Sequence, residues 1–276
     1  MNLYQGSKSQ MTDKTVTLSV TDGIATITFN RPDAMNTLDE ALSRDMIEAC
    51  ERAAAMTDLR GVVLTGAGKA FMAGGDISDF GGMIAAQGPA EERRSEVERR
   101  IDLAHKALKA MKAIPVPVIA RIHGACAGIG LSFALHCDLA LAAEEATLTT
   151  AYIGIGLSPD GGMTHALIRR VGELKALELL LGTPRLTGVE AAKLKMVNAA
   201  VPLEQLDGAI MFITEGLKQG PALAIRRMTS LVRQARDNDL EAQLDLEAQS
   251  FADCAMTADF AEGVSAFLER RKPDFG

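Results

Sequence analysis

Short apolar runs alternate with amphipathic segments from residue 16 to residue 171, and this order constrains the fold more than any other feature. Strand-like runs occupy residues 16–20, 24–29, 61–66, 117–122 and 139–142. Helical periodicity is present over residues 38–56, 91–112, 130–136 and 161–171. Because strands that alternate with helices form parallel sheets, the sequence predicts an α/β architecture.

The pattern changes from residue 173 onward, where the sequence predicts helices alone, over 173–181, 188–195, 203–219, 222–236, 240–255 and 258–270. The helices after residue 200 carry apolar side chains that a lone copy would expose, among them Leu206, Ile210, Phe212, Ile213 and Leu217. Packing against another copy of the chain would cover this surface.

These patterns divide the chain into three parts. We expect a disordered, tag-like N-terminus over residues 1–14 and an α/β core over residues 15–200. Residues 201–276 are expected to form a helical oligomerisation region.

Composition argues against several function classes. The net charge is −7, and aromatic residues make up 4% of the chain without any tryptophan, so we expect no nucleic-acid binding. No apolar run approaches the ~18 residues of a membrane span. The four cysteines contain no Cys-x-x-Cys pair and the four histidines form no metal-ligand pattern. We therefore expect a cytoplasmic protein without a membrane segment or a metal site.

Two glycine-rich turns about fifty residues apart carry the clearest chemical signal. The first is Phe71-Met72-Ala73-Gly74-Gly75-Asp76, and the second runs from His123 to Gly130. Small residues let the backbone come close to a ligand, so two such turns can aim two N–H groups at one oxygen. An acid, Asp160, follows in Pro159-Asp160-Gly161-Gly162. Such a set suits the stabilisation of an enolate beside a group that moves its proton.

Two of these residues have simpler interpretations. Asp160 precedes a predicted helix and is a favoured residue for capping a helix N-terminus. Ser132 lies at the start of an apolar helix, where a packing role is expected. A protease-like use of Ser132 as a nucleophile lacks a matching His and Asp pattern.

The motifs, taken in order, resemble the enoyl-CoA hydratase/isomerase (crotonase) family. Asn30-Arg31-Pro32, the two turns, Cys137-Asp138 and Pro159-Asp160-Gly161-Gly162 follow one another as they do in that family. The resemblance runs from about residue 16 to the end of the chain. It implies a Clp protease-like spiral of repeated β-β-α units with a helical C-terminal region. It also implies a homotrimer or a dimer of trimers.

The resemblance assigns roles to the turns and the acids. In similar proteins the backbone N–H groups at the positions of Gly75 and Ile129 bind the thioester oxygen of an acyl-CoA. Family hydratases use two glutamates, and those positions hold Ser132 and Tyr152 here, neither of which is a carboxylate base near neutral pH. Isomerases often place one acid at the position of Asp160. That pattern favours isomerisation of an enoyl-CoA double bond.

Coenzyme A would be part of the substrate, and no separate cofactor is expected. The resemblance implies substrate or CoA contacts at Ala34, Met35, Ala73, Asp76, Ile77, Ser132, Phe251, Phe267 and Arg270. Tyr152 is expected either to shape the acyl pocket or to hydrogen-bond the enolate. Other interpretations stay open: hydration or other acyl-CoA chemistry of the family, a dehalogenase branch with Asp160 as nucleophile, and a catalytically silent acyl-CoA-binding paralogue.

Overall fold

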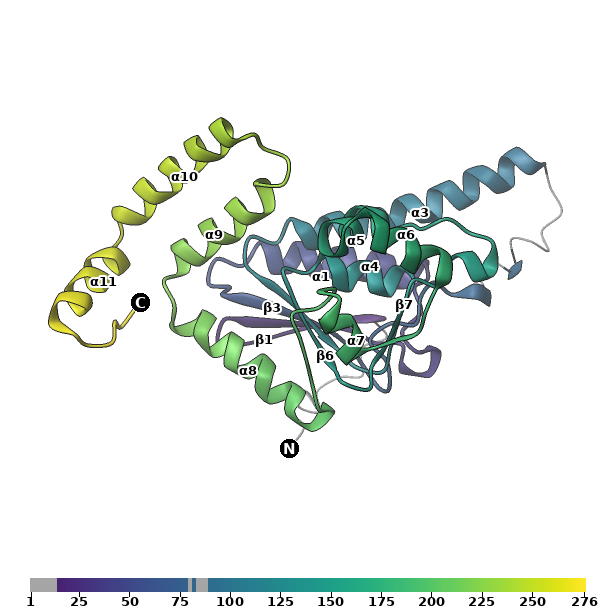
Figure 1. The fold of residues 1–276 in the computed structure, drawn as a ribbon, viewed down its shortest axis with the longest axis horizontal. Coiled ribbons are helices and arrows are strands. Elements are labelled where there is room, and N and C mark those ends of the chain that lie inside the picture. Colours follow the sequence, from purple (N-terminus) through teal and green to yellow (C-terminus); the bar gives the residue numbers. More distant parts are fainter. Residues whose placement is uncertain (1–13, 79–80, 83–88) are drawn as a thin grey trace.

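A computed structural model describes residues 14–78, 81–82 and 89–276, so the predicted N-terminal segment lies almost wholly outside the described residues. The centre of the fold is a six-stranded sheet in the order β1-β2-β3-β4-β6-β9 (Figure 1). Its strands are β1 (Val16–Thr21), β2 (Ile24–Phe29), β3 (Gly61–Gly66), β4 (Val118–Ile122), β6 (Leu139–Ala143) and β9 (Ala199–Val201). All neighbours from β2 onward pair in parallel, which confirms the predicted architecture.

The first two strands form the one antiparallel pair of this sheet. Asp22 and Gly23 join them with φ values of 49° and 75°. Two consecutive left-handed residues are the requirement of the tightest hairpin turn, and Asp-Gly is a preferred pair for it. The sequence therefore fixes this hairpin locally.

Helices cover both faces of the large sheet. On one side, α1 (Glu40–Ala54) packs on β1 and β2 and on the long helix α3 (Ala90–Lys112). On the other side, α8 (Leu203–Gln219) crosses β3, β4, β6 and β9 (Figure 1). Every residue of β3 is buried as a result, which is why that strand is an unbroken run of small and apolar residues.

A second sheet has three short strands in the order β5-β7-β8. They are β5 (Ala125–Ala127), β7 (Thr147–Thr149) and β8 (Leu186–Thr187), and α4 (Ile129–His136) begins directly after β5. The prediction of helices alone after residue 173 is wrong, because β8 joins this sheet and β9 joins the large one. Strands of two or three residues are too short to produce a visible alternation of apolar and polar side chains.

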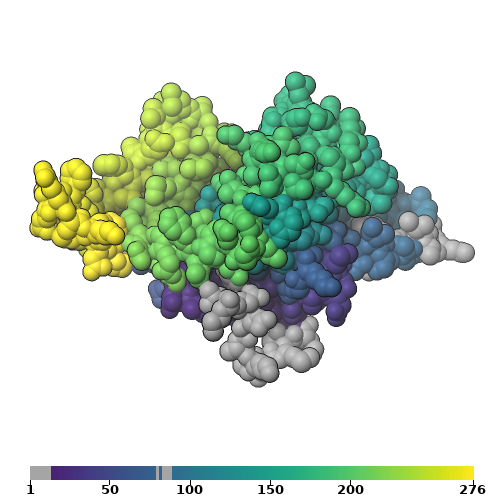
Figure 2. All heavy atoms as spheres, turned by 60° about the horizontal axis from the view of Figure 1, so that its bottom comes forward, coloured from purple at the N-terminus to yellow at the C-terminus, as the bar shows by residue number. Residues whose placement is uncertain are grey.

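The remaining helices complete the core and the C-terminal region. They are α5 (Met163–Val171), α6 (Glu173–Gly182), α7 (Gly188–Lys193), α9 (Ala222–Gln234), α10 (Leu240–Ala255) and α11 (Ala258–Glu269). Figure 2 shows the C-terminal residues, coloured yellow, gathered at one end of the molecule. Among the described residues, no helix is both long and apolar enough to cross a membrane.

The apolar side chains of α8 do not form the exposed surface predicted for them. Leu206 and Ile210 are fully buried, and Ile213 and Leu217 are partly buried against the same core. Only Phe212 of that set is largely exposed, at 82%. The prediction was wrong because the sheet has a second face that α8 itself covers. Exposed apolar residues are found instead on α9, α10 and α11.

Candidate active site

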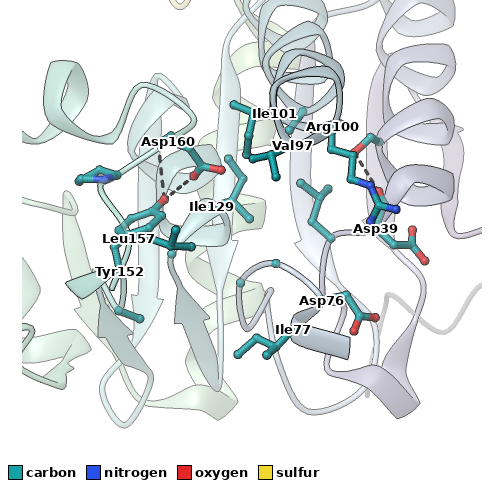
Figure 3. A pocket seen from close by; sticks show the side chains of 18 of the residues that line it. Asp39, Asp76, Ile77, Val97, Arg100, Ile101, Ile129, Tyr152, Leu157 and Asp160 are labelled. Carbon is teal, nitrogen blue, oxygen red and sulfur yellow. Dashed lines mark hydrogen bonds between the residues drawn. The ribbon is translucent and has the colours of Figure 1, made fainter. Parts of the chain in front are cut away.

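A cavity of about 360 Å³ opens between the two glycine-rich turns, the start of α1, the middle of α3 and residues 151–160 (Figure 3). Apolar side chains such as Val97, Ile101 and Leu157 form much of its wall. The four predicted catalytic residues, Gly75, Ile129, Tyr152 and Asp160, all line it. Ala73, Asp76 and Ile77 from the predicted substrate contacts line it as well.

Backbone hydrogen bonds bring the two turns together. Met72 donates its N–H to the carbonyl of Ala125 at 3.1 Å, and its own carbonyl accepts from Ala127 at 2.9 Å. Gly74 and Gly128 have φ values of 109° and 50°, which side chains rarely tolerate. A Cβ built on Gly128 would lie 3.7 Å from the Cα of Gly74, so the turns touch where each needs glycine.

The N–H groups of Gly75 and Ile129 are free to bind a ligand. Ile129 is the first residue of α4, whose opening N–H groups have no partner within the helix. Neither N–H donates to an acceptor within the described part of the chain. The partial positive charge at the start of α4 adds to the attraction for a negative oxygen. Both N–H groups are thus at the cavity without a described acceptor.

The carboxylate of Asp160 lies at the same cavity and is held by Tyr152 (Figure 3). The Tyr152 hydroxyl donates to Asp160 Oδ1 at 2.7 Å. Ser132 is fully buried, and its hydroxyl donates to the backbone carbonyl of Asp160 at 3.2 Å. Ser132 Oγ is also 3.4 Å from the Tyr152 hydroxyl. Ser132 thus binds the backbone of Asp160 and does not line the cavity.

Burial controls the ionisation of this pair. It raises the pKa of Asp160, and the hydrogen bond from Tyr152 opposes that rise by stabilising the carboxylate. Burial, followed by the charge of Asp160, also raises the pKa of Tyr152. Tyr152 therefore stays protonated and donates. A carboxylate with a raised pKa is suited to taking up a proton and returning it.

Asp160 does not cap α5, so that simpler interpretation was wrong. Gly162 occupies the N-cap position, and the helix has no side-chain cap hydrogen bond. The carbonyl of Asp160 accepts the N–H of Met163 at 3.0 Å, while its carboxylate faces Tyr152.

The other predicted substrate contacts lie outside the cavity wall. Ala34 and Met35 lie beside the first turn, where the Met35 carbonyl accepts the Ala73 N–H at 3.1 Å. Phe251, Phe267 and Arg270 belong to α10, α11 and the residue after α11, far from the cavity of their own chain (Figure 1).

Asp76 lines the cavity, but its carboxylate is already bound by other side chains of the protein. It accepts from Ser78 and pairs with Arg31 at 3.1 Å, and these contacts lower its pKa. Asp39 also pairs with Arg31, at 3.2 Å, and Glu40 pairs with Arg99 at 2.8 Å. These acids of the cavity wall are therefore held in ion pairs.

Sequence reasoning missed the wall contributed by α3. Val97, Arg100, Ile101 and His105 all line the cavity. Ile101 and His105 are four residues apart and so share a helix face. The helical periodicity over residues 91–112 was visible in the sequence, but a lone histidine on a helix belongs to no recognised motif. Within the described residues, no group of three or more His, Cys, Asp or Glu side chains is placed to hold a metal ion.

Comparisons with known proteins agree with this geometry. The profile of the enoyl-CoA hydratase/isomerase family matches residues 19–276. A Rhodobacter capsulatus protein named "Probable enoyl-CoA hydratase" is 35% identical over 96% of this chain and 99% of its own length. The 1,2-epoxyphenylacetyl-CoA isomerase of Escherichia coli is 32% identical over 93% of this chain and 96% of its own.

Solved structures share the fold. The crystal structure of an enoyl-CoA hydratase from Mycobacterium smegmatis superposes with a TM-score of 0.86 at 30% identity, covering 95% of this chain and 99% of that one. This agreement extends through the two sheets and the C-terminal helices, as expected for the predicted crotonase spiral. The chain belongs to the enoyl-CoA hydratase/isomerase family.

Proposed function

We propose that the protein isomerises the double bond of an enoyl-CoA, with Asp160 as the proton shuttle. The thioester carbonyl would lie between the N–H groups of Gly75 and Ile129. Asp160 would remove a proton from the α carbon of a 3-enoyl-CoA, leaving a dienolate and a protonated carboxyl. The same carboxyl would return the proton to the γ carbon, which gives the 2-enoyl-CoA.

The observation that carries the proposal is that, among the described residues lining the cavity, Asp160 is the one carboxylate not held in an ion pair. Asp160 has Tyr152 as its neighbour, whereas Asp39, Glu40 and Asp76 are held by Arg31 or Arg99. Hydration by the two-glutamate route needs acids at the positions of both Ser132 and Tyr152, and neither residue is an acid. Isomerisation needs only one, because one group removes and returns the proton.

The fixed N–H groups explain how such a weak carbon acid could be deprotonated. Negative charge moves onto the thioester oxygen as the proton leaves, and preorganised donors stabilise that charge more than they stabilise the ground state. Loss of one such donor typically slows an enzyme by ~10²–10³-fold. The relatives' names include both a hydratase and an isomerase, so the preference for isomerisation depends on this chain's own residues.

The substrate's coenzyme A would lie along the first turn, near Ala34, Met35, Ala73 and Ile77. No additional cofactor is proposed. Phe251, Phe267 and Arg270 would reach CoA only from a neighbouring copy, because they are remote from the cavity of their own chain. We therefore propose a homotrimer or a dimer of trimers.

Product analysis with two substrates tests the reaction. Purified protein is incubated with a 3-enoyl-CoA and, separately, with a 2-enoyl-CoA, and the products are separated by chromatography. We expect the 3-enoyl-CoA to become the conjugated 2-enoyl-CoA, and no 3-hydroxyacyl-CoA from either substrate. Rapid formation of the hydroxy product would contradict the proposal, and so would tight CoA binding without turnover on a broad acyl panel.

A further inference from the structure

We propose that His105 is a positioning residue that fixes the turn carrying Asp160. The proposal rests on the function proposed for Asp160, but the contact on which it depends is a feature of the fold itself. His105 Nε2 accepts the N–H of Gly161 at 3.1 Å, although the two residues are 56 positions apart in the sequence. His105 lies on α3 and contributes to the wall of the cavity.

The direction of this hydrogen bond defines the state of the imidazole ring. A backbone N–H can only donate, so Nε2 must present its lone pair. A neutral ring that accepts at Nε2 carries its proton on Nδ1. The neighbouring residues Ala104, Ala107 and Leu108 are buried in the core, so this part of α3 is held firmly. His105 therefore extends a fixed acceptor to the catalytic turn.

Beyond the contacts of Asp160 and Gly161, one other side chain holds this turn among the described residues: His136 Nε2 lies 3.2 Å from the carbonyl oxygen of Gly162. Gly161 and Gly162 follow Asp160 with φ values of 57° and 66°, and they contribute no side chain. A Cβ built on Gly161 would lie 2.2 Å from Ile129 Cδ1, so glycine is required where the turn packs on α4. Glycine has the greatest backbone freedom of any residue, and backbone contacts must supply the rigidity here.

Three elements then fix Asp160 from three sides. α3 holds the N–H of Gly161 through His105, and α4 holds the carbonyl of Asp160 through Ser132. Tyr152, just before the short helix η2 (Ile153–Ile155), holds the carboxylate. Of these three anchors, only His105 joins the turn to α3. Its loss would leave a buried N–H without a partner and let the turn shift.

Paired substitutions at position 105 separate this role from simple packing. His105→Gln keeps an acceptor, because the Gln Oε1 reaches about as far as the histidine Nε2. His105→Leu has similar bulk and no acceptor. We expect His105→Leu to lower kcat for isomerisation by about 10²-fold, the typical effect of displacing a catalytic group by about 1 Å. We expect KM to change little and His105→Gln to recover most of the lost kcat.

The kinetic outcomes decide the proposal. A His105→Gln variant as slow as His105→Leu would show that the acceptor is irrelevant. Wild-type kcat in His105→Leu would overturn the proposal directly, provided that thermal unfolding shows both variants to be folded.

A measurement without turnover separates this inference from the proposed function. The ¹⁵N chemical shifts of the His105 ring report which nitrogen carries the proton. We expect the Nδ1–H form, and a downfield-shifted amide proton for Gly161 that moves in His105→Leu. If the protein shows this tautomer but does not isomerise an enoyl-CoA, the His105 contact stands and the proposed function fails. An Nε2–H tautomer would overturn the role of His105 whatever the enzyme catalyses.

Discussion

At the scale of single residues, the proposed reaction depends on the pair formed by Tyr152 and Asp160. Burial favours the neutral carboxyl, and the hydrogen bond from Tyr152 favours the carboxylate, so these two influences on the pKa of Asp160 act in opposite directions. The acid must be ionised to remove a proton. Tyr152 is thus expected to keep Asp160 usable as a base at neutral pH without making its carboxylate too weak a base.

Tyr152→Phe tests this balance. Removing the hydroxyl takes a hydrogen bond from the ionised form, so the pKa of Asp160 should rise further. Because kcat/KM falls as the pH drops through that pKa, the acidic limb of the profile should move to higher pH. A hydrogen bond to a charged group is worth roughly 1.5–3 kcal/mol, which corresponds to about one to two pH units.

The measurement is a profile of kcat/KM against pH for the wild type and Tyr152→Phe. Ser132→Ala is the matched control, since it also removes a hydroxyl near Asp160 but one that bonds to the backbone carbonyl. An acidic limb that stays in place, or moves to lower pH, in Tyr152→Phe would contradict the account.

The start of α4 matters most at the scale of secondary-structure elements. Its second residue, Gly130, lies so close to the first turn that a built Cβ would be 2.4 Å from the carbonyl oxygen of Met72. The nearest atom is a backbone oxygen, which has little room to move, and the Met72 Cβ and Cγ follow at 2.7 and 2.9 Å. The packing of α4 on the first turn therefore sets the separation of the two N–H groups.

Gly130→Ala should separate the turns and slow isomerisation by ~10²–10³-fold, as expected for a lost oxyanion donor. It should also destabilise the fold by about 1–3 kcal/mol through overpacking.

Gly208→Ala in α8 is the control, because a Cβ there meets nothing within 4 Å. Removing a helical glycine should stabilise that variant by about 0.5–1 kcal/mol. Steady-state kinetics and thermal unfolding provide the comparison; unchanged kcat in Gly130→Ala would refute the role of this contact.

Sequence alone predicted the elements whose patterns are long and local. Leu42, Met46 and Ala53 were placed by helical periodicity and are buried in α1. The two- and three-residue strands β8 and β9 escaped notice, since they are defined by pairing with distant strands. The turns and Asp160 were predicted from resemblance and glycine chemistry. His105 was missed because its partner, Gly161, is close only in the folded chain.

At the scale of the whole molecule, the main feature is the exposed apolar surface of the C-terminal helices. Phe251 on α10 and Phe267 on α11 are 74% and 82% exposed, and α9 has no buried residue. Arg233 of α9 pairs with Asp138 and donates to the carbonyls of Lys112, Ile114 and Val116, so the base of this region is anchored to the core. The apolar surface beyond that anchor is available to another copy.

Phe251→Glu combined with Phe267→Glu should therefore weaken assembly. We expect light scattering after gel filtration to give the mass of a trimer or hexamer for the wild type and a smaller mass for the double variant. Gln205→Glu, an added charge at an exposed position on α8, is the control and should assemble normally. A wild-type protein that is monomeric at micromolar concentration would contradict the proposed assembly.

The proposed function depends most on the charge and position of Asp160. Asp160→Asn removes the charge and keeps nearly the same shape. Wild type and variant are compared on a 3-enoyl-CoA, following the rate of isomerisation and, separately, the binding of CoA. We expect kcat/KM to fall by ~10²–10⁴-fold, the usual contribution of a general base, with CoA binding retained. Isomerisation near the wild-type rate in Asp160→Asn would show that another group moves the proton.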